Sequence, residues 1–204
     1  GGREVRAALK AGQTQGGVVE INRAVAHDVM LGKMLEYSGG LYQKPEVELV
    51  VADGRSYART TRRRFRNIVM SLVDTWAAAS VGGLSLVEDG LYTVEAFRNL
   101  LDRLTDDGVL VVNRWDPEAD RLIALASAAL LAEGNATPGA HLYACSHTRS
   151  TALVVKKRPI SLEELGKLRG FCKKSRFVEV YAPDDPGSDL RAALVRDPWG
   201  TSRE

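Results

Sequence analysis

Gly16-Gly17-Val18-Val19-Glu20-Ile21-Asn22 is the stretch that decides the fold, because a short apolar run ends there in an acid. A continuous run of Val and Ile is typical of a buried parallel strand, and a carboxylate at its carboxyl end faces the crevice where open α/β sheets bind ligands. Glu20 is therefore placed to accept hydrogen bonds from two ribose hydroxyls.

A glycine pair precedes this strand at the spacing of a nucleotide-binding turn. Gly1-Gly2 opens a helical pattern over residues 3–11. The separation between Gly2 and Glu20 is close to the roughly 20 residues expected between such a turn and its ribose-binding acid. The pair alone is weak, because glycine also begins and ends elements for steric reasons. A strand normally feeds such a turn from the centre of the sheet, so we expect the first strand to be missing from the given chain.

A second strand delivers an acid to the same edge. Residues 47–52 read Val-Glu-Leu-Val-Val-Ala and lead into Asp53-Gly54. Because neighbouring parallel strands end at one edge of a sheet, this repetition matters more than either acid alone. The alternative for Glu20 and Asp53 is a pair of helix caps or turn formers, since acids after strands are common turn residues.

The rest of the chain alternates helix and strand before its character changes. We expect helices at 23–37, 55–64, 92–104, 117–133 and 161–174, and strands at 68–73, 109–112 and 177–181. Two further strands at 141–146 and 151–157 are joined too closely for a parallel crossover, so they form an antiparallel hairpin. The predicted fold is a doubly wound, mostly parallel α/β sheet that ends in an antiparallel hairpin.

Composition limits the function classes. The chain has 204 residues, of which 45% are hydrophobic, and a formal charge of +2. We expect one domain over 1–183 and a loop-rich tail over 184–204 that is mostly loop or frayed helix. The small net charge disfavours nucleic acid as a partner, and no apolar run of about 18 residues predicts a membrane span. We expect a cytoplasmic protein or the cytosolic domain of a larger membrane-attached one. Cys145 and Cys172 read as core residues, and no metal site is indicated.

Several sequence words together resemble the spermidine synthase (polyamine aminopropyltransferase) family, over about residues 1 to 160. This family has the class I S-adenosylmethionine-dependent methyltransferase fold. The words are Gly-Gly-Arg-Glu-Val at 1–5, Gly-Val-Val-Glu-Ile-Asn at 17–22, Tyr-Ser-Gly-Gly-Leu-Tyr at 37–42, Asp-Gly-Arg at 53–55 and Leu-Tyr-Thr-Val-Glu-Ala-Phe at 91–97. The antiparallel hairpin agrees with this fold and disfavours a nicotinamide oxidoreductase.

The resemblance implies a role for each matching residue toward S-adenosylmethionine or its decarboxylated form. Gly1 and Gly2 correspond to the glycine loop near the methionine moiety, and Glu20 to the acid that binds the ribose. Asp53 corresponds to the acid that accepts from the adenine amino group, and Gly54 lets the backbone approach the ring. The predicted ligand contacts also include Ile21 and Ser71.

The chain departs from the family after the third visible strand. Polyamine synthases carry two acids there, the first of which holds the attacking amine, whereas this chain reads Ser71-Leu72-Val73-Asp74. A serine hydroxyl neither pairs with a diamine cation nor acts as a base without a partner. Asp74 and Glu88 remain the candidate catalytic carboxylates, with exposed loop acids as the alternative for both.

Three functional hypotheses follow from these patterns. The first is a spermidine synthase-like transferase, as in polyamine biosynthesis. Its small-molecule acceptor is not assigned, and an amine is one option. The second is a methyltransferase, because transfer from a sulfonium depends mostly on positioning. The third is a non-catalytic sensing or interaction domain of a larger protein. A homodimer and fusion to segments outside the given chain are compatible with each hypothesis.

Overall fold

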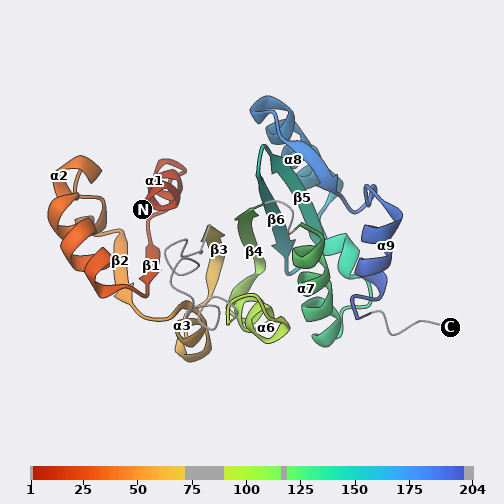
Figure 1. Cartoon of the computed structure of the whole chain (residues 1–204), viewed down its shortest axis with the longest axis horizontal. Coiled ribbons are helices and arrows are strands. Elements are labelled where there is room, and N and C mark those ends of the chain that lie inside the picture. The colour runs from red at the N-terminus through yellow and green to blue at the C-terminus, as the bar shows by residue number, and fades with distance from the viewer. Residues whose placement is uncertain (1, 72–89, 116–118, 200–204) are drawn as a thin grey trace, which may run out of the picture. The chain divides into compact units, whose positions relative to one another are not determined.

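The computed structural model describes residues 2–71, 90–115 and 119–199. The chain divides into two compact units, Gly1–Thr61 and Arg62–Glu204, and each is described by itself. The first unit lies in the red to orange part of Figure 1 and the second in the yellow to blue part. The expected single domain over 1–183 stays a prediction.

The first unit is built from two parallel strands and the helices that flank them in sequence. β1 pairs with β2 in parallel register, and Glu20, the last residue of β1, lies opposite Val51. The elements in chain order are α1 (Arg3–Lys10), β1 (Gly16–Glu20), the π-helix η1 (Val25–Lys33), α2 (Leu35–Ser38), the 3₁₀ turn η2 (Leu41–Gln43), β2 (Val47–Val51) and α3 (Gly54–Thr60).

A small apolar cluster holds this unit together. Leu41, Tyr42 and Val47 are buried at its centre, and side chains of α1 and of both strands pack around them. The cluster places the amino end of α1 against η2, since a Cβ atom on Gly2 would lie 2.8 Å from Leu41 Cδ2. Gly2 has a φ of 89°, a conformation that a larger residue adopts only with strain.

The second unit is organised around a five-stranded sheet with the order β3-β4-β6-β5-β7. β3 and β4 are parallel, and the other pairings are antiparallel. Its elements are β3 (Phe65–Ser71), α6 (Val94–Asp102), β4 (Leu104–Trp115), α7 (Ala119–Ala132), η3 (Pro138–His141), β5 (Leu142–His147), β6 (Ser150–Lys156), α8 (Leu162–Ser175), β7 (Val178–Tyr181) and α9 (Asp189–Arg196).

Helix caps and buried side chains fix this second unit. Thr93 caps α6 by accepting from Ala96 N, and Ser161 with Glu164 forms a capping box at the start of α8. One core cluster joins β5 to α8 and buries both cysteines, as expected of small core residues. Figure 1 shows α6, α7 and α9 as neighbours, and α7 packs against both of the other two.

The predicted strands and helices are found close to their expected positions, and the α/β class and antiparallel hairpin are confirmed. One strand is longer than expected. β4 runs over Leu104–Trp115 instead of 109–112, and its pairing jumps from Phe65 with Leu104 to Asn67 with Val109. This β-bulge needs Gly108, because a Cβ atom there would lie 2.7 Å from Leu104 Cβ. The tail over 184–204, expected to be mostly loop or frayed helix, contains helix α9.

Each unit has a strand with an open side. Among the described residues, β1 pairs with β2 alone and β3 pairs with β4 alone. The additional central strand expected from the sequence stays a prediction. No helix in the described part of the chain combines the length and apolar composition needed to cross a membrane.

Candidate functional site

The carboxyl edge of β1 and β2 carries both Glu20 and Asp53 within the first unit. Glu20 ends β1, and its carbonyl oxygen accepts from Ala52 N at 3.1 Å. Asp53 follows directly and caps α3. The sequence pattern therefore correctly predicted two acids at the ends of neighbouring parallel strands.

Each of these carboxylates uses one oxygen to hold the local backbone. Glu20 Oε1 accepts from Asn22 N at 2.8 Å, and Asp53 Oδ1 accepts from Ser56 N at 2.8 Å. One oxygen of each acid therefore does cap the local backbone, as the alternative interpretation expected. Within the described residues, the structure gives no hydrogen bond to Glu20 Oε2 or Asp53 Oδ2, and both side chains are half-buried. These two oxygens remain able to accept from a ligand.

Two exposed aliphatic side chains lie near the two acids in sequence. Ile21 directly follows Glu20 and is 54% exposed, and Val51 is 40% exposed at the end of β2. Exposed aliphatic side chains at the carboxyl end of parallel strands give a flat ring a surface to pack on. Gly54, predicted to let a ligand approach, begins α3 next to Asp53.

Tyr42 is a residue of this region that the sequence analysis did not single out. Its hydroxyl would lie 3.4 Å from a Cβ atom on Gly2. Burial raises the pKa of Tyr42, and the negative charges of Glu20 and Glu4 raise it further. Tyr42 thus lies within electrostatic reach of Glu20 while contacting the amino end of α1. The signal in the sequence was its position as the last residue of Tyr-Ser-Gly-Gly-Leu-Tyr at 37–42, one of the segments that resemble spermidine synthases.

The carboxyl edge of β3 and β4 forms a separate group in the second unit. Ser71 ends β3 opposite Asn113, whose Nδ2 lies 3.5 Å from Ser71 Oγ. The next residue of β4, Arg114, holds its guanidinium carbon 4.1 Å from the centre of the Tyr92 ring. Sequence reasoning found Ser71 but not Asn113, because a lone Asn at a strand end carries no distinctive pattern.

Several predicted site residues lie outside the described residues, namely Gly1, Asp74 and Glu88. Their roles stay predictions. In the part of the chain that is described, no group of three or more His, Cys, Asp or Glu side chains is arranged to hold a metal ion.

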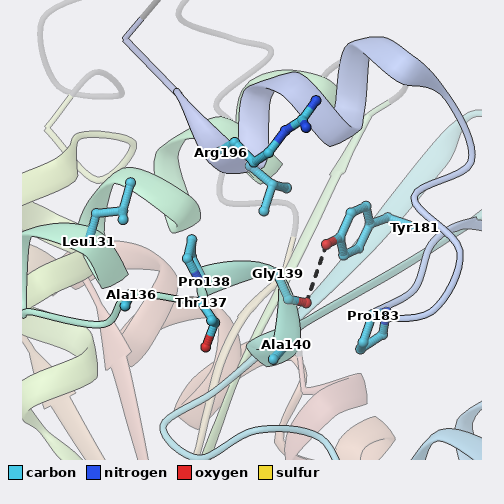
Figure 2. Close-up of a pocket in the computed structure, with 10 residues that line it drawn as sticks. Leu131, Ala136, Thr137, Pro138, Gly139, Ala140, Tyr181, Pro183 and Arg196 are labelled. Atoms are coloured by element: carbon cyan, nitrogen blue, oxygen red, sulfur yellow. Dashed lines mark hydrogen bonds between the residues drawn. The ribbon is translucent and has the colours of Figure 1, made fainter. Parts of the chain in front are cut away.

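A cavity of about 330 Å³ lies elsewhere in the second unit, between α7, η3, β7 and α9. Figure 2 shows the Tyr181 ring pointing toward η3, where its hydroxyl donates to Gly139 O at 3.3 Å. Arg196 is at the rim, and its guanidinium points away from Tyr181. No predicted site residue lines this cavity.

Comparisons with known proteins bear on the fold. No protein-family model matches the chain, and no curated protein matches its sequence significantly. The crystal structure of a spermidine synthase in complex with the transition state analogue AdoDATO matches 95% of this chain with a TM-score of 0.56 and 19% identity. The spermidine synthase from Thermotoga maritima matches 89% of this chain, with a TM-score of 0.51 and 20% identity.

A probable spermidine synthase from Corynebacterium glutamicum gives the same result, with a TM-score of 0.56, 17% identity and 81% of this chain covered. The chain spans 60%, 57% and 57% of the length of these three proteins, respectively. At such identities a structural match reports the course of the backbone and not the chemistry. The chain has the α/β fold of these spermidine synthases, which is the methyltransferase-like fold that the sequence words indicated.

Proposed function

We propose that the first unit binds the adenosyl part of S-adenosylmethionine or decarboxylated S-adenosylmethionine, and that the protein is a spermidine synthase-like transferase. The observation that carries this proposal is the pair of carboxylates at the ends of β1 and β2, each with one oxygen left over after capping. A capping role alone needs one oxygen of each acid. It gives no reason for two such acids to meet at the ligand-binding edge of a parallel sheet.

The residues of this edge fit an adenosyl group. Glu20 Oε2 would accept from the ribose hydroxyls, and Asp53 Oδ2 from the adenine amino group. Ile21 offers the exposed apolar surface that a purine ring packs on. Carboxylates accept such hydrogen bonds strongly because the acceptor is charged.

The co-substrate supplies an electrophilic carbon on a sulfonium, and the chain has to hold this carbon in line with an acceptor. Positioning of this kind contributes most of the effect in group transfers that need little acid or base help. The two acids fix the sugar and the base. Asp74 and Glu88 are proposed to handle the proton of the acceptor, as the sequence suggested.

Calorimetry with methylthioadenosine tests the proposal, because this compound carries the adenosyl group without the transferable one. We expect Glu20→Gln and Asp53→Asn each to weaken binding by about 10- to 100-fold, which corresponds to the loss of one charge-assisted hydrogen bond. The amide side chain in each variant keeps one oxygen that accepts from the local backbone N–H, so both caps are retained. The unfolding midpoints of the two variants should therefore stay near that of the unchanged protein.

Glu36→Gln is the matched control, because Glu36 is an exposed acid on α2 of the same unit. It should leave binding unchanged. Equal affinities for methylthioadenosine in all four proteins would contradict the proposed site. Tighter binding of NAD than of any adenosyl sulfonium compound would contradict the proposed ligand class.

A non-catalytic sensing domain is the second candidate. Ser71 favours it, because this hydroxyl stands where polyamine synthases have an acid. Binding of S-adenosylmethionine without turnover on any amine, hydroxyl or thiol acceptor would favour the sensing domain. A methylated product would favour a methyltransferase instead.

A further inference from the structure

The second unit contains a cavity between α7, η3, β7 and α9 whose volume is about 330 Å³. Small-molecule sites in proteins begin at about this size. The residues that line the cavity all belong to the second unit, and none of them has a role in the proposed adenosyl site. A ligand of this cavity is therefore independent of the transferase function.

Hydrogen bonds and an ion pair hold two walls of the cavity in place. On the η3 side, Thr137 N donates to Asn135 Oδ1 at 2.9 Å. On the α9 side, Arg191 pairs with Asp120 of α7 at 2.6 Å. These contacts form without a ligand, so the cavity is already shaped. A ligand that enters a preformed site loses less free energy to ordering of the protein.

Most of the lining is apolar. The side chains without polar atoms are those of Leu131, Ala136, Pro138, Ala140, Pro183 and Val195. Among the described residues that line the cavity there is no acid, and Arg196 is exposed at the rim with its guanidinium pointing away from Tyr181 (Figure 2). A charged group beside Tyr181 would lose hydration without an opposite charge from the lining. The lining therefore favours a neutral, mostly apolar ligand.

Tyr181 gives this apolar cavity one directional polar contact. Its hydroxyl donates to Gly139 O at 3.3 Å (Figure 2), so the phenol proton is already used. Burial raises the pKa of Tyr181, which keeps the hydroxyl protonated at neutral pH. The oxygen can still accept a hydrogen bond, and the described part of the chain supplies no donor to it. A ligand N–H or O–H fits this oxygen, whereas a ligand acceptor finds no proton there.

We propose that this cavity binds a neutral aromatic or heteroaromatic molecule that carries one N–H or O–H group. The ring packs on the apolar walls, and its donor faces Tyr181 Oη. Indole is a probe of this class, and 1-methylindole has the same ring system with a methyl group in place of the N–H hydrogen. Indole-3-carboxylate adds a negative charge, which Arg196 would attract if the cavity took anions.

NMR titration of the full chain tests the proposal through the backbone amide signals of Gly139 and Val195. We expect indole to shift both signals and to bind about 5-fold more tightly than 1-methylindole, the effect of one neutral hydrogen bond. In Tyr181→Phe the two probes should bind equally, because the acceptor is gone. Ala140→Leu puts a larger side chain in the lining and should abolish the shifts, which keeps the test decisive if Tyr181→Phe fails to fold.

Tyr143→Phe is the matched control. Tyr143 also has a buried hydroxyl that donates one hydrogen bond, to Cys172 Sγ at 3.2 Å, but it does not line the cavity. This variant should keep the preference for indole. The proposal is overturned if indole leaves the Gly139 and Val195 signals in place, or if 1-methylindole binds the unchanged protein as tightly as indole does. Tighter binding of indole-3-carboxylate than of indole would also overturn it, because the cavity would then recognise a negative charge.

Discussion

Single carboxylates in this chain hold the backbone and leave a second oxygen for another partner. Glu20 and Asp53 each satisfy one backbone N–H after a strand and keep the other oxygen at the sheet edge. Glu164 works similarly in the second unit, since it accepts from Ser161 N at 2.9 Å and pairs with Lys156 through its other oxygen. A cap fixes the direction of the side chain, so the remaining oxygen is already oriented.

The contribution of the Glu164 hydrogen bonds can be measured as a free energy of unfolding. The hydrogen bond from Lys156, followed by that from Ser161 N, lowers the pKa of Glu164. A carboxyl whose pKa is lowered on folding stabilises the protein above its unfolded pKa, and this contribution is lost as the pH falls through the folded pKa. Glu164→Gln should cost about 1 kcal/mol at pH 7 in urea unfolding, a value discounted for the partial exposure of Glu164. The difference from the unchanged protein should shrink toward pH 3.

The neighbouring acid provides the control for this measurement. Glu163 pairs with Lys167 one helical turn away, and both side chains are exposed to solvent. Glu163→Gln should change the unfolding midpoint very little at either pH, because exposed pairs of this kind contribute little. A larger loss in Glu163→Gln than in Glu164→Gln would show that the buried Lys156 does not need its partner.

At the scale of elements, local sequence signals predicted most of what the structure contains. Strands β1 and β2 follow from apolar runs closed by acids, and α8 follows from its capping box. The bulge in β4 was missed because Asp-Asp-Gly is also the pattern of a turn, and only pairing with β3 decides between the two. The sequence left α9 open between loop and frayed helix, because this helix is stabilised by packing on α7, including the Arg191 to Asp120 ion pair at 2.6 Å.

Replacing a glycine by alanine should have opposite effects on stability in two elements. A Cβ atom at Gly139 of η3 would lie 2.5 Å from the Tyr181 hydroxyl and 2.9 Å from Val195 Cγ1. Gly139→Ala should therefore destabilise the protein by about 1 to 3 kcal/mol through overpacking of this contact, which Figure 2 shows. Thermal unfolding of Gly139→Ala with and without Tyr181→Phe would reveal a smaller loss when the hydroxyl is absent.

Gly166 is the matched control within a helix. It lies inside α8, and a Cβ atom there would meet no other atom within 4 Å. Gly166→Ala should raise stability by about 0.5 to 1 kcal/mol, because alanine restricts the unfolded chain and favours the helix. If both alanine variants destabilised the protein equally, the contact with Tyr181 would not explain the loss at Gly139.

At the scale of the whole molecule, the division into two units is the feature that local patterns could not predict. Helix and strand alternate without interruption through residue 61, and composition does not change there. Glu20 and Asp53 belong to the first unit. Substitutions at these two acids therefore test the proposed binding of the adenosyl group without changing the second unit.

The boundary between the units makes a prediction for limited proteolysis. Residues 61–64 form no helix or strand, and the three consecutive arginines at 62–64 are exposed, so trypsin finds its preferred side chain in a segment without regular structure. Arg64 donates to the carbonyls of Asp102 and Leu104 at 3.0 and 3.2 Å, which protects its own bond. We therefore expect the first cut after Arg62 or Arg63, and mass spectrometry should identify it. The double variant Arg62→Gln/Arg63→Gln should slow this cut and leave later ones unchanged. Early cleavage inside α6, α7 or α8 with residues 61–64 intact would show that the boundary lies elsewhere.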